Sequence, residues 1–284
     1  MRRRFFALLP LLLGACSPLT AFNSVVPKDR AGSVLARDQA YGTDKRQRLD
    51  IYGPRKVAAG ARLPVIVWFY GGSWNSGSKG GYAFAGQALA SRGFIVAVPD
   101  YRLVPEVRYP AFLEDGASAV RWVRGNIARY GGDPDRLVLA GHSAGAYNAA
   151  MLALDPRWLG ADRAAVKGLA GLAGPYDFLP LDVPSTQNAF GQVADLPSTQ
   201  PVNFASAGDP PALLVAGAED TLVRPRQSAR LAQKLAEAGV PVETRLYPGV
   251  GHIGVMTALA KPLRGKAPVL DDVAAFAERV TAQR

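Results

Sequence analysis

Short apolar runs alternate along the chain with stretches in which apolar residues recur at helical spacing. Several of these runs are rich in Val, Ile and Leu without polar alternation, which is typical of strands that are buried on both faces of a sheet. Strands that alternate with helices predict βα units on a largely parallel sheet. The predicted strands are Gln47–Tyr52, Pro64–Tyr70, Phe94–Val98, Arg136–Ala140, Val166–Leu172, Ala212–Ala216 and Val242–Tyr247.

Helical periodicity follows most of the predicted strands. Residues Gly174 to Pro211 are different, because they are Pro-rich and have no clear period, and a loop of that length in a compact domain is usually functional. The fold class is therefore predicted to be α/β, with a mostly parallel central sheet flanked by helices. The predicted helices are Ala83–Arg92, Pro110–Tyr130, Ala144–Ala153, Arg226–Ala238 and Leu270–Ala282.

The composition fits one globular domain. Of the 284 residues, 49% are hydrophobic and 20% are charged, which argues against disorder, collagen-like repeats and coiled coils. The net charge is +10, and three of the positive charges are Arg2, Arg3 and Arg4. No run of Lys and Arg in the body of the chain indicates a nucleic-acid site, so we expect a solvated basic surface and no nucleic-acid partner.

The N-terminus has the features of a bacterial export signal. Three arginines precede an apolar run that ends at Ala15 and is too short to span a bilayer. The run closes with Leu13-Gly-Ala-Cys16, which resembles the lipobox of bacterial lipoproteins, where cleavage precedes the Cys and lipid is attached to it. The resemblance implies a signal peptide over residues 1–15 and an acylated Cys16, while a plain secretory signal with an incidental Cys stays open.

These features imply where the mature protein resides. Several acyl chains on one Cys would anchor it stably to a lipid membrane. Ser17 stands where an Asp would mark inner-membrane retention in lipoproteins, so the outer membrane is favoured, with the domain in the periplasm or at the cell surface. Residues 16–45, which contain Pro18 and Pro27, are expected to form a tether and N-terminal arm, and residues 46–284 the main domain.

Cys occurs once in the chain and His twice. One Cys excludes an intramolecular disulfide, a thiolate-rich zinc site and an iron–sulfur cluster bound by this chain alone. The chain has no H-E-x-x-H motif and no G-x-G-x-x-G after a first strand, so neither a metal nor a dinucleotide cofactor is expected. Any imidazole chemistry falls to His142 and His252.

A nucleophile is predicted at Ser143. The strand Arg136–Ala140 leads directly into Gly141-His-Ser-Ala-Gly145, and a helical pattern follows. Glycines on both sides permit a sharp turn, because a Cβ at either position would crowd the neighbouring strand or helix. Strand, turn and helix together would present the Ser143 side chain at the C-terminal edge of the sheet.

A serine hydroxyl needs a general base, and His252 is the better of the two histidines. His142 adjoins the predicted nucleophile and points away from it, as a local packing or hydrogen-bonding group would, whereas His252 lies in a Gly-rich loop after a predicted strand. The base in turn needs a carboxylate to fix its tautomer. Asp220 follows a buried strand and is predicted to be this acid, with Glu219 as the fallback.

Backbone donors for a developing oxyanion are predicted in two places. The strand that ends at Tyr70 is followed by two glycines, a serine and a tryptophan, and adjacent glycines let N–H groups turn toward a bound carbonyl. Gly72 and Ser73 would supply two donors, and Ala144, directly after the predicted nucleophile, would supply a third.

Six motifs between about Leu49 and the C-terminus carry a family resemblance. They are Tyr70-Gly-Gly-Ser-Trp74, Asp100-Tyr-Arg-Leu103 with Pro105, Glu114-Asp115, Gly141-His-Ser-Ala-Gly145, Gly217 to Asp220 and Gly251-His252. Together they resemble the carboxylesterase and hormone-sensitive-lipase-like branch of the α/β hydrolases, which includes feruloyl-esterase and arylformamidase relatives. The order Ser143, Asp220, His252 is also that of α/β hydrolases. The resemblance implies an α/β-hydrolase fold and a cofactor-free serine hydrolase that cleaves small carboxylic esters through an acyl-enzyme.

Two features depart from that family. Its His-Gly-Gly motif begins here with Tyr70, so the hydrogen bond that braces the loop comes from a phenol or is missing. The long N-terminal cap of the lipase-like members is absent, which leaves Gly174–Pro211 as the expected pocket cover. Hydrolysis of an amide, such as an aryl formamide, and a non-catalytic surface binding module on the same fold stay open as alternatives.

Two further groups of residues are expected near the site. Aromatic side chains are candidates for the walls of an apolar pocket, although each such residue is more often simply part of a core. A set of charged residues is interpreted as structural ion-pairing groups, not catalysts. The aromatic candidates are Tyr70, Trp74, Phe178, Phe190 and Phe204, and the charged residues are Asp100, Arg102, Glu114 and Asp115.

Overall fold

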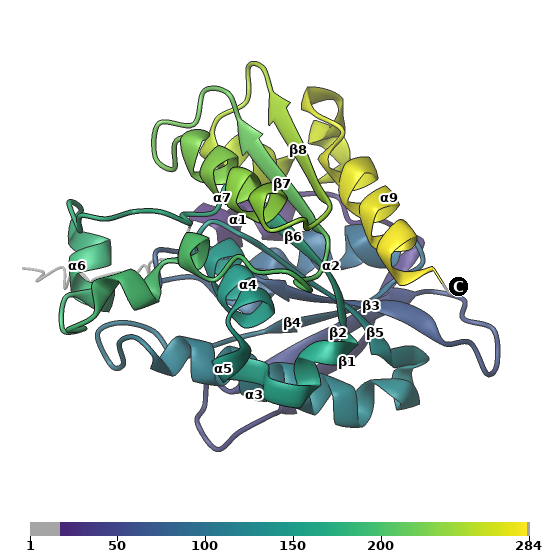
Figure 1. Ribbon diagram of the computed structural model, residues 1–284. Helices are drawn as coiled ribbons and strands as arrows, with labels where there is room; N and C mark the ends of the chain where they lie inside the picture. The colour runs from purple at the N-terminus through teal and green to yellow at the C-terminus, as the bar shows by residue number, and fades with distance from the viewer. Residues whose placement is uncertain (1–17, 283–284) are drawn as a thin grey trace, which may run out of the picture.

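Eight strands form one sheet in the computed structural model, which describes residues 18–282 (Figure 1). They are β1 (Gly32–Ala40), β2 (Arg48–Pro54), β3 (Leu63–Phe69), β4 (Ile95–Pro99), β5 (Gly132–His142), β6 (Val166–Leu172), β7 (Ala212–Gly217) and β8 (Val242–Tyr247). Their order in the sheet is β1-β2-β4-β3-β5-β6-β7-β8. Strand β2 is antiparallel to both of its neighbours, and β3 to β8 run parallel to one another. The predicted α/β class with a mostly parallel sheet is confirmed.

Helices cover both faces of this sheet. The α-helices are α1 (Pro18–Val25), α2 (Ala83–Ala90), α3 (Ala111–Asn126), α4 (Ala144–Leu154), α5 (Pro156–Leu159), α6 (Pro184–Phe190), α7 (Arg226–Glu237), α8 (His252–Thr257) and α9 (Val269–Thr281). The 3₁₀ turns are η1 (Lys79–Tyr82), η2 (Ile127–Tyr130), η3 (Gly160–Ala165), η4 (Leu196–Thr199), η5 (Pro201–Asn203) and η6 (Lys261–Lys266). Within residues 18–282, no helix combines the length and the apolar character needed to cross a bilayer.

The side chains of the central strands contribute to two hydrophobic cores, one on each face of the sheet. Val65 and Val67 of β3 pack with residues of α3, α4 and α7, whereas Ile66 and Trp68 pack with residues of α2, α8 and α9. All four side chains are fully buried. Because helices cover both faces, alternate positions of a central strand are equally apolar, which explains the unbroken runs of Val, Ile and Leu in the sequence.

The N-terminal part of the described chain contains a helix and an edge strand. Helix α1 and strand β1 lie within residues 18–45, in the segment for which the sequence predicts a tether and N-terminal arm. The sequence does not predict strand β1, because a strand at the exposed edge of the sheet has no continuous apolar run. The pairing of β1 with β2 also contains register shifts. The predicted signal peptide and Cys16 lie outside the described residues.

A sharp turn joins β5 to α4 at Ser143. The serine has φ 55° and ψ −125°, a conformation that costs a non-glycine residue about 1–3 kcal/mol. The turn is tight because the first turn of α4 lies against the end of β3. A Cβ at Gly145 would lie only 2.1 Å from the carbonyl oxygen of Phe69. Because glycine has no Cβ, the backbones of α4 and β3 can lie in direct contact at this position.

We expect Gly145→Ala to destabilise the protein by about 3 kcal/mol or more, because the added methyl group must push apart two backbone segments. Gly125→Ala is the matched control. It lies near the end of α3 with nothing within 4 Å of an added Cβ, and it should stabilise the protein by about 0.5–1 kcal/mol. Urea unfolding followed by circular dichroism measures both changes, and equal midpoints for the two variants would contradict the close-contact interpretation.

Candidate active site

Ser143, His252 and Asp220 form a continuous chain of hydrogen bonds. His252 Nε2 lies 2.9 Å from Ser143 Oγ, and His252 Nδ1 lies 2.7 Å from Asp220 Oδ2. The carboxylate also accepts the backbone N–H groups of Leu222 and Val223 at 2.9 and 2.8 Å. With Asp220 fixed in this way, Nδ1 of His252 is the donor and Nε2 is left to accept the serine proton. The structure thus brings together the three residues predicted as nucleophile, base and acid.

The sheet edge positions the acid and the base. Asp220 follows β7 in a turn in which its N–H donates to the Gly217 carbonyl at 3.1 Å. His252 is the first residue of α8, so the Gly-rich loop expected around it ends one residue earlier, at Gly251. Glu219, the fallback acid, is exposed, and Asp220 is the carboxylate that reaches the imidazole.

His142 connects two sides of the site. Its Nε2–H donates to the His252 carbonyl at 3.1 Å, and its Nδ1 lies 3.4 Å from the Tyr82 hydroxyl. Tyr82 in turn accepts the N–H of Gly71 at 3.0 Å. Burial, assisted by the nearby His252, lowers the pKa of His142 to about 3. His142 is therefore neutral near pH 7 and bridges the loop after β3 to the start of α8.

The predicted oxyanion donors lie beside Ser143. Ser73 and Ala144 line one pocket together with the serine, and Gly72 lines a second pocket that the serine also borders. Within residues 18–282, the backbone N–H groups of all three have no hydrogen-bond acceptor. Gly72, Ser73 and the following Trp74 have φ values of 141°, 51° and 58°, so successive N–H groups turn out of the strand direction. Free donors at this point can receive a developing negative charge.

Tyr70, directly after β3, is linked through Arg46 to the loop that carries Gly72 and Ser73. Its phenol accepts a hydrogen bond from Arg46 at 2.7 Å, and the same guanidinium donates to the carbonyls of Gly77 and Tyr101 at 2.9 and 2.8 Å. Tyr101 stacks on Tyr70 with ring centroids 4.6 Å apart. Burial raises the pKa of Tyr70 well above its usual value, so the phenol stays neutral. The Tyr70 phenol therefore reaches the loop only through Arg46, and the phenol that binds the loop backbone directly is that of Tyr82, at the N–H of Gly71.

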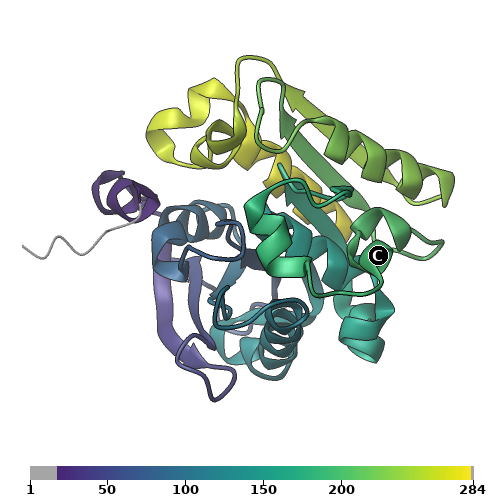
Figure 2. The ribbon, with the colours of Figure 1, turned by 90° about the vertical axis from the view of Figure 1, so that its left-hand side faces the viewer.

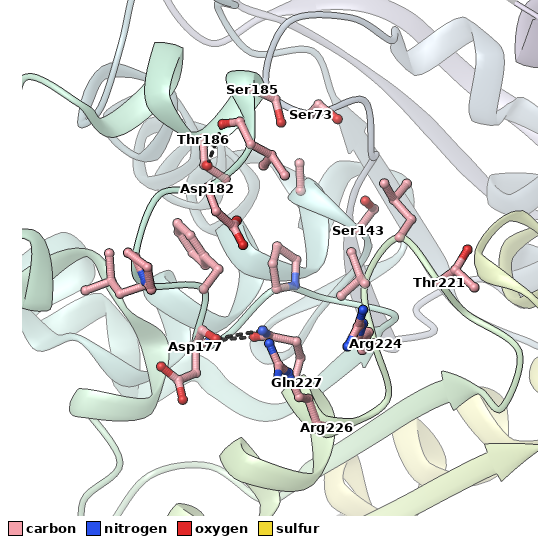
Figure 3. Close-up of a pocket in the computed structure, with 18 of the residues that line it drawn as sticks. Ser73, Ser143, Asp177, Asp182, Ser185, Thr186, Thr221, Arg224, Arg226 and Gln227 are labelled. Carbon is pink, nitrogen blue, oxygen red and sulfur yellow. Dashed lines mark hydrogen bonds between the residues drawn. The ribbon is translucent and has the colours of Figure 1, made fainter.

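Two pockets meet at Ser143. The larger has a volume of about 620 Å³ and is shown in Figure 3. Of the five aromatic candidates, Trp74 and Phe178 line it. The other three aromatic candidates do not line it: Tyr70 and Phe190 are fully buried behind the site, and Phe204 packs partly buried under Arg157. Sequence alone could not separate them, since core and pocket aromatics have the same spacing.

The segment 174–211 covers the larger pocket, as expected. Phe178 and Asp182 from this segment line the pocket, and Figure 3 shows Asp182 opposite Arg224 and Arg226. Gln227 holds the segment in place, because its Oε1 accepts the N–H groups of Tyr176 and Asp177 and its Nε2 donates to the Asp177 carbonyl. Sequence analysis missed Gln227; a polar residue on the buried face of the predicted helix was the available signal.

The charged residues near the site are structural, with one exception. The guanidinium of Arg102 donates three hydrogen bonds to the buried carboxylate of Asp115, at 2.7, 2.9 and 3.0 Å, and the backbone N–H of Arg102 donates a fourth at 2.8 Å. Asp100 accepts the N–H of Lys79 at 2.7 Å. Glu114 is exposed and forms no salt bridge among residues 18–282, contrary to expectation, although, beside the hydrogen bonds to Asp115, its charge contributes to raising the pKa of Arg102. Over the same residues, no three His, Cys, Asp or Glu side chains are grouped so that they could hold a metal ion.

The chain is similar to several known proteins. Residues 49–235 match the BD-FAE family. The chain is 30% identical over 264 residues to isoprenylcysteine alpha-carbonyl methylesterase ICME of Arabidopsis thaliana, covering 84% of this chain and 61% of the relative. It is 33% identical over 231 residues to carboxylesterase NlhH of Mycobacterium tuberculosis, covering 72% and 70%. The chain spans between half and two thirds of the length of the curated methylesterases that it matches.

The fold itself recurs in solved esterase structures. Esterase B of Lactobacillus rhamnosis, inhibited by a tributyrin phosphonate, superimposes with a TM-score of 0.80 at 19% identity, covering 93% of this chain and 90% of the other. At that identity the likeness concerns the fold, which is the α/β-hydrolase fold that the motifs implied. From the family match and the arrangement of strand, turn and helix around Ser143, the chain belongs to the BD-FAE family of α/β hydrolases.

Proposed function

We propose that the protein is a serine carboxylesterase that cleaves small carboxylic esters through an acyl-enzyme. The observation that carries the proposal is the hydrogen-bonded chain from Asp220 through His252 to Ser143, at a point where two pockets meet. Two pockets at one nucleophile suit the two halves of an ester. The names of the relatives, a carboxylesterase and a methylesterase, support the same reaction class.

Each group of the site has a defined role in the proposed reaction. Ser143 Oγ attacks the ester carbonyl while His252 Nε2 takes its proton, and Asp220 stabilises the imidazolium. The negative charge that develops on the carbonyl oxygen is received by the N–H groups of Ser73 and Ala144, with Gly72 close by. His252 then donates the proton to the leaving alkoxide, which departs as the alcohol. A water molecule, activated by the same imidazole, hydrolyses the acyl-serine and releases the acid.

Ser143→Ala should lower the turnover of p-nitrophenyl esters by at least about 10⁴-fold, because no other group can form the acyl-enzyme. The wild-type chain should also be labelled covalently by a fluorophosphonate, and the variant should not. Labelling and turnover are measured on the same preparations, with circular dichroism to verify folding. A folded wild-type protein that neither turns over esters nor reacts with the probe would contradict the proposal and leave a binding module.

Asp220→Asn should lower kcat by about 10⁴-fold while leaving the fold intact, because an amide in place of the carboxylate favours the wrong tautomer of His252. The adjacent Glu219→Gln serves as the matched control and should leave kcat within about twofold, since that side chain is exposed. Steady-state kinetics on one ester compare the two variants. A large loss in Glu219→Gln, or a small one in Asp220→Asn, would reassign the acid.

We further propose that the domain is exported and held at the cell envelope, in the outer membrane, by lipid on Cys16. The support is the sequence alone, in which three arginines and a short apolar run precede the Leu-Gly-Ala-Cys motif. Growth with an alkynyl fatty acid should label the wild-type protein, and Cys16→Ser should abolish the label and release the domain from membranes. Label retained on the Cys16→Ser variant would exclude this anchor.

A further inference from the structure

We propose that helix α1 forms one wall of the pocket for the leaving alcohol, and that Leu19 and Phe22 make this pocket selective for esters of apolar alcohols. The inference rests on the proposed esterase function and deepens it, because it assigns one half of the substrate to each pocket. It also gives a binding role to a segment that the sequence indicates to be a tether.

The second pocket at Ser143 differs in chemistry from the larger one. Its volume is about 500 Å³, and it is lined by Leu19, Phe22, Tyr82 and Met256 as well as by the serine. No Asp, Glu, Lys or Arg lies among the described residues that line it. The larger pocket, by contrast, is lined by two aspartates and three arginines: Asp177, Asp182, Arg224, Arg226 and Arg230. The second pocket therefore suits a hydrocarbon group.

The position of the general acid decides which half of the ester enters this pocket. In the proposed reaction His252 donates a proton to the leaving oxygen, so the alcohol must lie within hydrogen-bond reach of its imidazole. His252 lines the second pocket and does not line the larger one. The oxyanion donors are shared between the pockets, since Ala144 lines only the larger one, Gly72 only the second, and Ser73 both. The alcohol is thereby assigned to the pocket under α1, and the acyl group to the larger pocket.

Specific contacts hold α1 against the pocket. Asn23 donates to the Gly80 carbonyl at 2.8 Å and accepts the N–H of Phe84 at 3.0 Å, so one side chain ties the helix to η1 and α2. The ring of Phe22 meets that of Phe84 edge to face, with centroids 5.3 Å apart. A Cβ at Gly81 would lie 3.8 Å from Cγ of Leu19, which is ordinary contact distance. Figure 2 shows the helix beside these elements, at the edge of the molecule.

The rim of the pocket is apolar as well. Leu222 and Ile253 line it and are 70% and 58% exposed, although large hydrophobic side chains of a folded protein are mostly buried. Both residues follow members of the hydrogen-bonded chain, Asp220 and His252 respectively, so the exposed apolar surface lies at the entrance to the site. An apolar alcohol group that enters here would cover surface that is otherwise in contact with water.

Two ester series in the full chain test the inference. One keeps the acetyl group and varies the alcohol from methyl to butyl, and the other keeps the methyl alcohol and varies the acid from acetate to butyrate. In the wild-type protein, kcat/KM should rise about three- to fourfold for each methylene added to the alcohol, as expected for burial of a methylene group. In Phe22→Ala, the butyl-to-methyl ratio of the alcohol series should fall at least about fivefold, while the ratio of the acyl series stays within twofold.

Val25→Ala is the matched control, because Val25 lies in the same helix, is 79% exposed and does not line the pocket. Both of its ratios should equal the wild-type ratios. Leu19→Trp adds bulk to the pocket, whereas Phe22→Ala removes it, and Leu19→Trp should also lower the butyl-to-methyl ratio of the alcohol series. The same effect from added bulk would show that pocket shape, and not a loosened helix α1, causes the change in Phe22→Ala.

The outcomes separate this inference from the proposed function. Fluorophosphonate labelling counts active sites in every preparation, so all ratios refer to functional protein. A wild-type protein that hydrolyses esters, with alcohol ratios unchanged in Phe22→Ala and Leu19→Trp, overturns the inference and leaves the esterase proposal standing. Ratios that change in the acyl series instead would reverse the assignment of the two pockets. A wild-type protein without labelling or turnover overturns the esterase proposal itself.

Discussion

Direct contact between two backbone segments determines the geometry of the whole site. The first turn of α4 lies so close to the end of β3 that neither glycine of the turn has room for a Cβ: at Gly145 it would meet the Phe69 carbonyl, and at Gly141 it would meet first the backbone of Gly145 and then the same carbonyl. This contact forces Ser143 into its strained conformation and lifts its side chain above the sheet. It also brings the free N–H group of Ala144 to the loop that follows β3. Nucleophile and oxyanion donors are thus fixed by one constraint on chain packing.

Buried neutral groups hold the remaining parts of the site in place. His142 and Tyr70 are both buried titratable residues, and burial moves the pKa of each away from neutrality, downward for the imidazole and upward for the phenol. His142 bridges the loop after β3 to His252, and Tyr70 supports the same loop through Arg46. Because neither group changes its charge near pH 7, the scaffold stays unchanged while His252 gains and loses a proton during the proposed reaction.

Local signals made the parallel strands and the candidate site predictable from the sequence. Unbroken apolar runs marked the strands, and the two glycines of the motif around Ser143 marked the turn, although the contact that requires Gly145 is with Phe69 of the distant strand β3. The missed features depend on contacts distant in sequence. Strand β1 has no apolar run, and Gln227 matters only because residues 176 and 177 fold against it. Leu19 and Phe22 have helical spacing, but a short helix flanked by prolines gains its stability from docking, which composition does not reveal.

Helix α1 begins at Pro18, two residues after Cys16. A fully extended chain advances at most about 3.6 Å per residue, so a lipid on Cys16 would lie within about 7 Å of the first helical residue along the chain. If the proposed lipid on Cys16 anchors the domain, Leu19 and Phe22 hold the second pocket near the membrane surface. Esters dissolved in the membrane would then reach the serine by lateral diffusion in two dimensions, and their surface density, not their concentration in water, would govern the rate.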